Sequence, residues 1–312
     1  MTSFAVVITS YNYRDFVGMA IDSALAQSRA PMQVIVVDDG STDGTPAHLR
    51  ERYGHDSRVT LVCGENGGQL VAFQRGVAHA RADVVCFLDA DDRWEPDYLA
   101  RLGELYDSRR DVDFVFSDMR LFGDEQRWMG YAARSRDIGF TAISTYISMR
   151  WYGAPTSALS MRALWARRTL ELPAELGHTW RLSADNCLVF GASVLGARKY
   201  YLRTGAVHYR IHGNNGWWGR QTAATKYLNR FRSRCLIEIY ARNIGLDERC
   251  LESVKHEFRT KPEPSWREAR HYAKLARLRR GSWLRNQQRA ASILWSAIRQ
   301  RRRAAGTQPN TD

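Results

Sequence analysis

Lysine is missing from the first 198 of the 312 residues, and proline is rare, with 8 in the whole chain. With 44% hydrophobic residues and so few prolines, the sequence is not that of a largely disordered chain. No segment approaches the ~18 consecutive apolar residues that a membrane-spanning helix needs. No basic segment followed by a long apolar run opens the chain. We therefore expect a folded protein that is soluble or peripheral, with disorder limited to its last few residues.

Cysteine pairs with metal-binding spacing are also missing. The five cysteines are odd in number and form no C-x-x-C motif, which argues against a disulfide framework and against a zinc site. This usage fits a reducing compartment, and we expect a cytoplasmic protein.

The excess positive charge is confined to the C-terminal third. The chain has 46 basic and 33 acidic residues, a net charge of +13. Residues 221–312 hold 21 basic and 8 acidic residues, which is again +13, so residues 1–220, with 25 of each, are neutral. This asymmetry predicts a globular domain over 1–220 and a helical basic region over 221–312 that meets an anionic surface, either membrane or nucleic acid.

Strands and helices alternate through the first half of the globular domain. The predicted strands are 4–9, 33–37, 59–62 and 84–88, and the predicted helices are 15–27, one ending near 52, and 69–80. This alternation is typical of βαβ units, so it predicts an α/β fold with a mainly parallel central sheet and helices on both faces. Further on, the predicted elements are strands at 112–117, 157–161 and 207–211, a helix at 184–195, and basic helices from 221 with breaks at Gly245, Pro262, Pro264 and Gly281.

Carboxylates follow two of the predicted strands. Asp38 and Asp39 end the second strand, and the run Asp89-Ala90-Asp91-Asp92 ends the fourth. The carboxyl ends of parallel strands form the edge where open α/β sheets bind ligands, so the two clusters can converge on one crevice. Three carboxylates this close repel one another unless a cation neutralises them. The run therefore predicts a Mg²⁺ or Mn²⁺ site for a diphosphate, with a solvated acidic turn before a helix as the alternative.

Four motifs resemble glycosyltransferase family 2 in their order and spacing. They are VVITSYN at 6–12, VVDDGSTDGT at 36–45, NGG at 66–68 and FLDADD at 87–92. The resemblance is specific to about residue 100, thinner to about residue 215, and absent from the tail. It implies an inverting transferase that uses a nucleotide sugar. It also implies a single Rossmann-like GT-A domain, in which 1–110 bind the nucleotide and 111–220 the acceptor.

The resemblance also implies roles for residues near the nucleotide. Asp39, with Asp38 beside it, is similar to the carboxylate that binds the uracil or thymine edge; a carboxylate can accept the hydrogen bond that the base N3–H donates. Thr9 and Tyr11 match positions that line the base, and Asp89 matches a ribose contact. Each of these residues could instead serve only as a turn or capping residue.

Metal and phosphate contacts are implied in the same way. Asp91 matches the direct metal ligand of the family, so the expected cofactor is Mg²⁺ or Mn²⁺. Residues 208–215 resemble the family's late Arg-x-His segment, which lies over the diphosphate. His212 would be a further metal or phosphate contact and Arg210 a phosphate contact, with a structural histidine as the alternative.

The segment Leu182–Leu188 resembles the family's acidic dipeptide before a helix, whose second member is the catalytic base. Asp185 matches that base, although Ala184 replaces the first acid of the pair. Inverting transfer needs one base to take the proton of the acceptor hydroxyl. Asp185 could instead be a helix N-cap, and the other acids between residues 126 and 220 are Asp137, Glu171 and Glu175.

Tryptophan is plentiful, with 10 residues. Four of them lie in the predicted acceptor half, where ring faces could stack on sugars: Trp128, Trp151, Trp217 and Trp218. Ordinary packing is the simpler interpretation for any one of them.

The basic tail has an amphipathic pattern. Ile293, Leu294, Ala297 and Ile298 share one helical face, and arginines follow at 299 and 301–303. An apolar face beside arginine and tryptophan suits an anionic lipid surface, so we expect peripheral attachment at the inner face of the membrane. The alternative is that this face packs on the catalytic domain or on a second subunit, which leaves a homo-oligomer open.

The sequence as a whole predicts metal-dependent transfer of a sugar from a UDP- or dTDP-sugar to a hydroxyl of a glycan or lipid-linked acceptor, in surface polysaccharide or glycoconjugate synthesis. A sugar nucleotidyltransferase is an alternative of the same fold class, but those enzymes have a Gly-rich loop where this chain reads Ser10-Tyr11-Asn12-Tyr13. A receiver domain would need a lysine before position 199, and the chain has none there. An NAD-binding domain would need a G-x-G-x-x-G motif after the first strand, and this motif is missing. A nucleic-acid-binding protein acting through the tail is the other alternative. We expect no nucleic-acid partner, because it would leave the acidic clusters unexplained.

Overall fold

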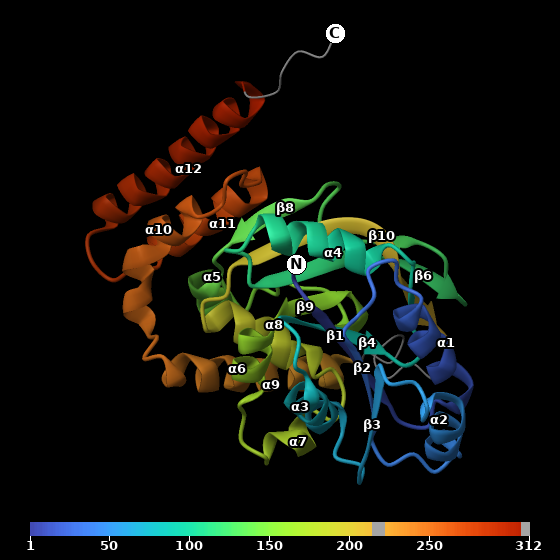
Figure 1. Ribbon diagram of the computed structural model, residues 1–312. Coiled ribbons are helices and arrows are strands. Elements are labelled where there is room, and N and C mark those ends of the chain that lie inside the picture. Colours follow the sequence, from blue (N-terminus) through green and yellow to red (C-terminus); the bar gives the residue numbers. More distant parts are fainter. Residues whose placement is uncertain (214–221, 307–312) are drawn as a thin grey trace.

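The computed structural model describes residues 1–213 and 222–306 (Figure 1). The described residues do not include Trp217 and Trp218. They also do not include the last residues of the chain, for which the sequence predicts disorder. Within the described part, a ten-stranded sheet has the order β3-β2-β1-β4-β9-β6-β10-β5, with β7 beside β6 and β8 beside β10. The strands are β1 (Phe4–Ser10), β2 (Gln33–Asp38), β3 (Val59–Cys63), β4 (Val84–Asp89), β5 (Arg93–Trp94), β6 (Phe114–Gly123), β7 (Trp128–Met129), β8 (Arg136–Gly139), β9 (Leu159–Arg162) and β10 (Lys199–Ile211).

The first four strands are parallel, and β1, β2 and β4 are buried. These three are short runs rich in β-branched and aliphatic residues, the pattern of strands covered on both faces. Strand β3 lies at the edge of the sheet and is partly exposed. Strand β9 runs against β4 and β6, while β6 and β10 are parallel to each other and share the direction of β1–β4. The predicted α/β fold with a mainly parallel central sheet is confirmed.

Helices cover both faces of this sheet. Right-handed crossovers place α1 and α2 on one side of the first strands and α3 on the other, and Figure 1 shows this arrangement, with α6 on the side of α3. The helices up to residue 194 are α1 (Arg14–Leu25), α2 (Thr45–Tyr53), α3 (Gln69–His79), α4 (Tyr98–Ser108), α5 (Ala142–Ser148), α6 (Ala163–Leu170), α7 (Leu176–Thr179) and α8 (Asp185–Val194).

Strand register brings the predicted site residues to one edge. Ser10 of β1 pairs with Asp38 of β2, and on the other side Thr9 pairs with Asp89 of β4. The tips of three adjacent strands therefore present both acidic clusters together, as the sequence predicts.

Strand β10 is longer than the predicted strand at 207–211, because it begins at Lys199. Its register against β6 shifts between Leu202 and Val207, and Gly205 has a φ of 64°. This irregularity interrupts the alternation of side chains, so that only the second half of the strand is visible as a pattern in the sequence.

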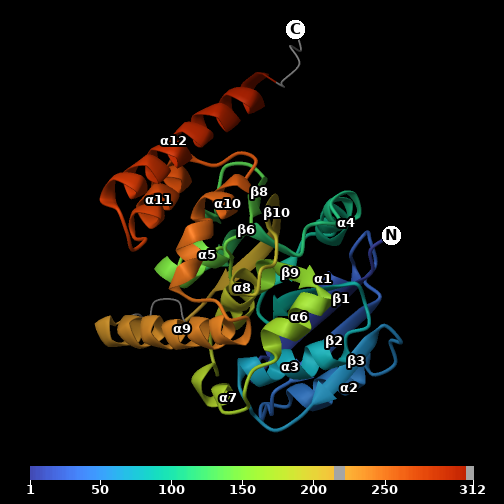
Figure 2. The same ribbon diagram turned by 90° about the vertical axis from the view of Figure 1, so that its left-hand side faces the viewer.

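The C-terminal region is helical, as predicted, and its breaks fall at the predicted glycines and prolines. It comprises α9 (Ala223–Asn243), a 3₁₀ turn (Glu248–Ser253), α10 (Val254–Arg259), α11 (Trp266–Arg277) and α12 (Trp283–Gly306). Figures 1 and 2 show α12 at the outer end of the molecule against α11. None of the described helices is both long enough and apolar enough to cross a membrane.

Two hydrophobic cores are present in the described residues. The main core includes Leu236, Ile237 and Tyr240 of α9, so this core continues past residue 220. A smaller core joins α10, α11 and α12 to Ile143 of α5. The division into a domain over 1–220 and a region over 221–312 stays a prediction.

Candidate active site

A cavity of about 1170 Å³ opens at the carboxyl edge of the first strands. Seven of the predicted site residues line it: Thr9, Tyr11, Asp39, Asp89, Asp91, Asp185 and His212. They come from the ends of β1 and β4, the loop after β2, the start of α8 and the end of β10. Two predicted site residues, Asp38 and Arg210, do not line the cavity.

Asp39 holds the loop that follows β3. Its Oδ1 accepts a hydrogen bond from the Gly67 amide (2.9 Å) and its Oδ2 one from the Gly68 amide (2.7 Å). Arg75 pairs with Oδ1 at 3.2 Å. Gly68 has a φ of 88°, and a Cβ there would lie 2.6 Å from the Cα of Arg181, which explains the glycine at this position. Because each carboxylate oxygen has two lone pairs, Oδ2 can still accept a bond from a ligand.

Asp38 points away from the cavity. It is 1% exposed, and its Oδ1 accepts the Ser41 amide hydrogen bond at 3.0 Å, which closes the turn after β2. Its Oδ2 has no partner among the described residues. The neighbouring acids Asp38 and Asp39 therefore differ in their surroundings, one within the turn and one on the cavity wall.

Asp91 and His212 meet across the cavity edge. His212 Nε2 lies 2.9 Å from Asp91 Oδ2. The imidazole is stacked on Phe16, with ring centroids 5.4 Å apart, and Tyr13 packs edge-on against it at 6.0 Å. This packing fixes the ring, so the carboxylate and the imidazole are brought together in advance of any ligand.

Arg210 is occupied within the protein. Its Nε donates to the Asp91 carbonyl at 3.0 Å, and its guanidinium lies over the rings of Phe16 and Phe122, 5.0 and 4.4 Å from their centroids. Its backbone amide donates to Asp92 Oδ1 at 2.7 Å. In this position Arg210 supports the Asp91–Asp92 turn, and its contact with phosphate stays a prediction.

The acidic run is electrostatically crowded. Burial raises the pKa of Asp89 and of Asp92 well above the ordinary value, and the nearby Asp91 carboxylate raises both further. Within the described ranges, no group of three His, Cys, Asp or Glu side chains is arranged to hold a metal ion. Asp91 and His212 nevertheless fit a Mg²⁺ or Mn²⁺ ion that takes its other ligands from phosphate and water, and such a cation would relieve the crowding.

Asp185 begins helix α8 after a strained residue. Ser183 has a φ of 59°, which is uncommon for a residue with a side chain. Burial raises the pKa of Asp185 to about 6. Asp185 is the first residue of α8, and the N-cap position before it is held by Ala184, whose side chain makes no capping hydrogen bond. A carboxylate of this pKa on the cavity wall can act as a general base near neutral pH.

Gln69 links the two acidic parts of the site, and sequence reasoning missed it. Its Oε1 accepts the Ala184 amide bond at 2.8 Å, and its Nε2 donates to Asp89 Oδ1 at 3.2 Å. It therefore ties the start of α8 to the tip of β4. Its place directly after the NGG motif is the only signal in the sequence that could have indicated it.

The other walls of the cavity come from the second half of the chain. Trp151, Met149 and Met129 line it, and so do Lys226 and Arg230 of α9. The indole Nε1 of Trp151 has no partner among the described residues.

Trp128, by contrast, is used within the protein. Its Nε1 donates to Asp118 at 2.8 Å, and Arg203 stacks on its ring with the guanidinium 5.5 Å from the centroid. It does not line the cavity, so sugar stacking on this ring stays a prediction.

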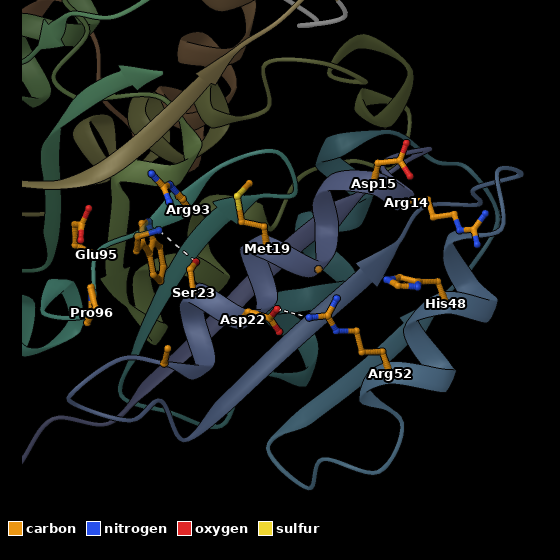
Figure 3. A pocket seen from close by; sticks show the side chains of 13 residues that line it. Arg14, Asp15, Met19, Asp22, Ser23, His48, Arg52, Arg93, Glu95 and Pro96 are labelled. Atoms are coloured by element: carbon orange, nitrogen blue, oxygen red, sulfur yellow. Dashed lines mark hydrogen bonds and ion pairs between the residues drawn. The ribbon is translucent and has the colours of Figure 1, made fainter. Parts of the chain in front are cut away.

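A second hollow of about 930 Å³ lies between α1, α2 and β5 (Figure 3). Figure 3 shows Asp22 paired with Arg52 on one side of it. The Ser23 hydroxyl oxygen accepts a hydrogen bond from the Trp94 backbone amide at 3.2 Å. None of the predicted site residues lines it. We therefore take the cavity at the strand tips as the candidate active site.

Comparison with known proteins identifies the family of this chain. The model of a family described as Glycosyl transferase family 2 matches residues 5–166. An uncharacterized glycosyltransferase of Nostoc sp. is 32% identical over 231 residues, which cover 71% of this chain and 69% of that protein. The putative teichuronic acid biosynthesis glycosyltransferase TuaG of Bacillus subtilis is 35% identical over 122 residues, covering 39% of this chain and 48% of that protein. The structure of S. aureus TarS 1–349 in complex with UDP is similar in fold, with a TM-score of 0.54 at 15% identity over 95% of this chain and 70% of that one.

Proposed function

The chain belongs to glycosyltransferase family 2, and from this premise we propose that it is an inverting enzyme that uses a UDP- or dTDP-sugar. The observation that carries the proposal is the single cavity that collects Asp39, Asp89, Asp91, Asp185 and His212. Family membership favours glycosyl transfer over the sugar nucleotidyltransferase alternative.

The donor would lie along the tips of β1, β2 and β4. Asp39 would accept the N3–H of the base, with Thr9 and Tyr11 beside the ring and Asp89 at the ribose. The similar TarS structure contains UDP, which supports a uridine nucleotide here.

Mg²⁺ or Mn²⁺ would be held by Asp91 and His212, which meet at the cavity edge. When bound, the ion would neutralise charge that develops on the departing nucleoside diphosphate. The fixed imidazole and the raised pKa values of Asp89 and Asp92 support a cation at this place.

Asp185 would act as the base in a single displacement. The acceptor oxygen forms its bond to the anomeric carbon as the bond to the diphosphate oxygen breaks, and the electron pair leaves on the diphosphate. The hydroxyl proton passes to the Asp185 carboxylate. Attack opposite the leaving group inverts the anomeric configuration, with no covalent enzyme intermediate.

The acceptor would be a hydroxyl of a glycan or of a lipid-linked sugar, in cytoplasmic assembly of a surface polysaccharide. The name of the Bacillus relative, which refers to teichuronic acid biosynthesis, supports this pathway class.

We also propose that the C-terminal helices bind an anionic membrane surface. The predicted lipid-facing residues Ile293 and Ala297 are buried in the smaller core, where α12 packs on α11 and α10, so these two residues are not available to lipid. What remains exposed is Trp283 (73%), Leu284 (60%) and Trp295 (56%). Arg299 lies over the Trp295 ring at 5.7 Å. Indole rings beside arginines suit the lipid interface, so these residues would make the contact.

A panel of nucleotide sugars tests the proposed function. UDP- and dTDP-sugars, with GDP- and CMP-sugars as controls, would be added to the full chain with and without Mg²⁺, and thermal stability and donor hydrolysis measured. We expect stabilisation and slow hydrolysis with a UDP- or dTDP-sugar only when Mg²⁺ or Mn²⁺ is present. Stabilisation by no nucleotide sugar would contradict the proposal.

A further inference from the structure

Helix α9 forms one wall of the cavity with a polar face. Lys226, Asn229, Arg230 and Ser233 line the cavity, and their spacing of three and four residues places them on one side of the helix. We propose that this face binds the acceptor, and that the acceptor is a glycan that carries negative charge as uronate or phosphate. The proposal rests on the proposed glycosyltransferase function and names its substrate class.

The two cations of this face have no acidic partner in the described part of the chain. No carboxylate there lies within ion-pair distance of Lys226 or Arg230, whereas Arg234, one turn further along, pairs with Glu238 at 3.5 Å. Cations that line a cavity without a counter-ion favour an anionic ligand.

The charge of the cavity argues for the acceptor as that ligand. Asp89, Asp91 and Asp185 line the same cavity, and the donor adds a diphosphate. An anionic acceptor that approaches Asp185 would be repelled by these groups. Lys226 and Arg230 would offset that repulsion, and a neutral acceptor would not need them.

The position of α9 relative to the predicted base is fixed by packing. Leu236 and Ile237 are buried in the main core, and the Tyr240 hydroxyl lies within hydrogen-bond distance of the carbonyl oxygens of Thr169 (2.6 Å) and Cys187 (3.0 Å), between which its one hydrogen is shared. Cys187 lies in α8, two residues after Asp185. The cationic face and the base are therefore held by the same pair of helices.

Exposed aromatic rings lie beside the cations on α9. Tyr227 is 66% exposed and Phe231 is 56% exposed, and their rings are stacked with an interplanar angle of 16°. Each directly follows one of the two cations in the sequence, so the rings form the adjacent strip of the helix. Ring faces next to cations suit a sugar chain better than a small anion.

Binding of defined oligosaccharides tests this proposal. The probes are a hyaluronan decasaccharide for uronate, a poly(glycerol phosphate) oligomer for phosphate, and maltodecaose as the neutral counterpart. Their affinity for the full chain would be measured by calorimetry with UDP and Mg²⁺ present. We expect at least one anionic probe to bind about tenfold more tightly than maltodecaose, which is the scale of two partly exposed ion contacts.

Variants of α9 assign the preference to its cations. The double variant Lys226→Ala/Arg230→Ala should remove the preference for the anionic probe. The charge-conserving variant Lys226→Arg/Arg230→Lys should keep that preference. The control Arg232→Ala, which removes an exposed cation outside the cavity, should have no effect. Tyr227→Ala should weaken binding of the same probe severalfold. UDP affinity should be the same in all of these variants.

Three results would overturn the proposal. Maltodecaose could bind as tightly as both anionic probes, the double alanine variant could retain the preference, or that variant could lose UDP affinity, which would assign the cations to the donor diphosphate. Failure of the wild-type protein to bind UDP with Mg²⁺ would instead count against the proposed function, so the two failures are distinguishable.

Discussion

Asp38 and Asp39 are adjacent in the sequence and differ in their surroundings. The strand pattern indicates that both lie at the tip of β2, and the family resemblance implies that the second contacts the base. Only the structure shows that Asp38 turns inward to the Ser41 amide while Asp39 lines the cavity. Successive side chains of an extended segment point in opposite directions, which separates the two roles.

Asp39→Ala should weaken UDP binding far more than it lowers turnover at saturating donor. The base edge is remote from the reacting carbon, so the contact contributes equally to the ground state and the transition state. Calorimetry with UDP measures the affinity, and Asp38→Asn is the control, expected to leave it within about twofold because Asp38 is off the cavity wall. An unchanged UDP affinity in Asp39→Ala would show that this carboxylate serves only the loop at Gly67 and Gly68.

Asp91→Ala should lower metal-dependent turnover by about 100-fold or more, since a lost Lewis acid removes several kcal/mol of charge stabilisation. Turnover of the donor would be measured across a Mg²⁺ and Mn²⁺ titration, with Asp97→Asn, an exposed carboxylate paired with Arg101, as the control. The variant should stay folded. Full wild-type activity in EDTA would contradict the metal assignment.

Turnover at saturating donor should rise with pH through about 6 and level off above it. Burial raises the pKa of Asp185 to about 6, and only the deprotonated form can take the acceptor proton, so the rate falls as pH drops through that value. Asp185→Asn should lose about 100-fold or more and show no such pH step, while UDP affinity is unchanged. If turnover survives, the base must be another acid.

The same pKa shift predicts a change in folding stability. Because the folded protein holds this proton more tightly than the unfolded chain, Asp185 contributes a destabilisation that develops as pH rises from 3.8 to about 6 and persists above. Asp185→Asn should therefore be at least as stable as the wild type at pH 8 in thermal unfolding. A marked loss of stability there would indicate a structural role.

At the scale of elements, the regular βαβ half could be predicted and the rest only partly. Long buried runs such as β1 and β4 carry a strong signal, whereas β5, β7 and β8 are too short to show alternation. The register shift in β10 interrupts its alternation of side chains, so the part of this strand before residue 207 was not predicted from the sequence. The contribution of α9 to the cavity could not be predicted, because it depends on how Tyr240 docks against α8.

The exposed apolar residues of helix α12 predict binding to anionic lipid. Liposomes with anionic lipid should co-sediment the full chain at low salt, and Trp283→Ser/Leu284→Ser/Trp295→Ser should reduce the bound fraction severalfold, since these exposed residues would enter the interface. Removing the chain beyond about residue 260 would not be a suitable test, because it would also remove Tyr272. The Tyr272 hydroxyl donates to Glu257, which accepts hydrogen bonds from the Ile143 and Ser144 amides of α5. Leu164→Ser, an exposed leucine on α6, is the matched control.

Full recovery of the wild-type protein in the supernatant would rule out the membrane role. Equal binding of the triple variant and the wild type would show that another surface makes the contact.

At the scale of the whole molecule, the cavity is assembled from residues as far apart as Thr9 and Ser233. The family model ends at residue 166, so the predicted base, His212 and the wall from α9 all lie beyond it. The motifs are dense in the half that we propose binds the donor, so its position at the strand tips could be predicted from the sequence. The half that we propose binds the acceptor depends on packing between helices that carry few local signals.

The central claim is that donor and base share this one cavity and that transfer is a single displacement. Proton NMR of the reaction with water as acceptor tests it most directly: the full chain, Mg²⁺ and an α-linked UDP- or dTDP-sugar are mixed, and the free sugar is followed before its anomers equilibrate. The account predicts that the β-anomer appears first. First appearance of the α-anomer would contradict it.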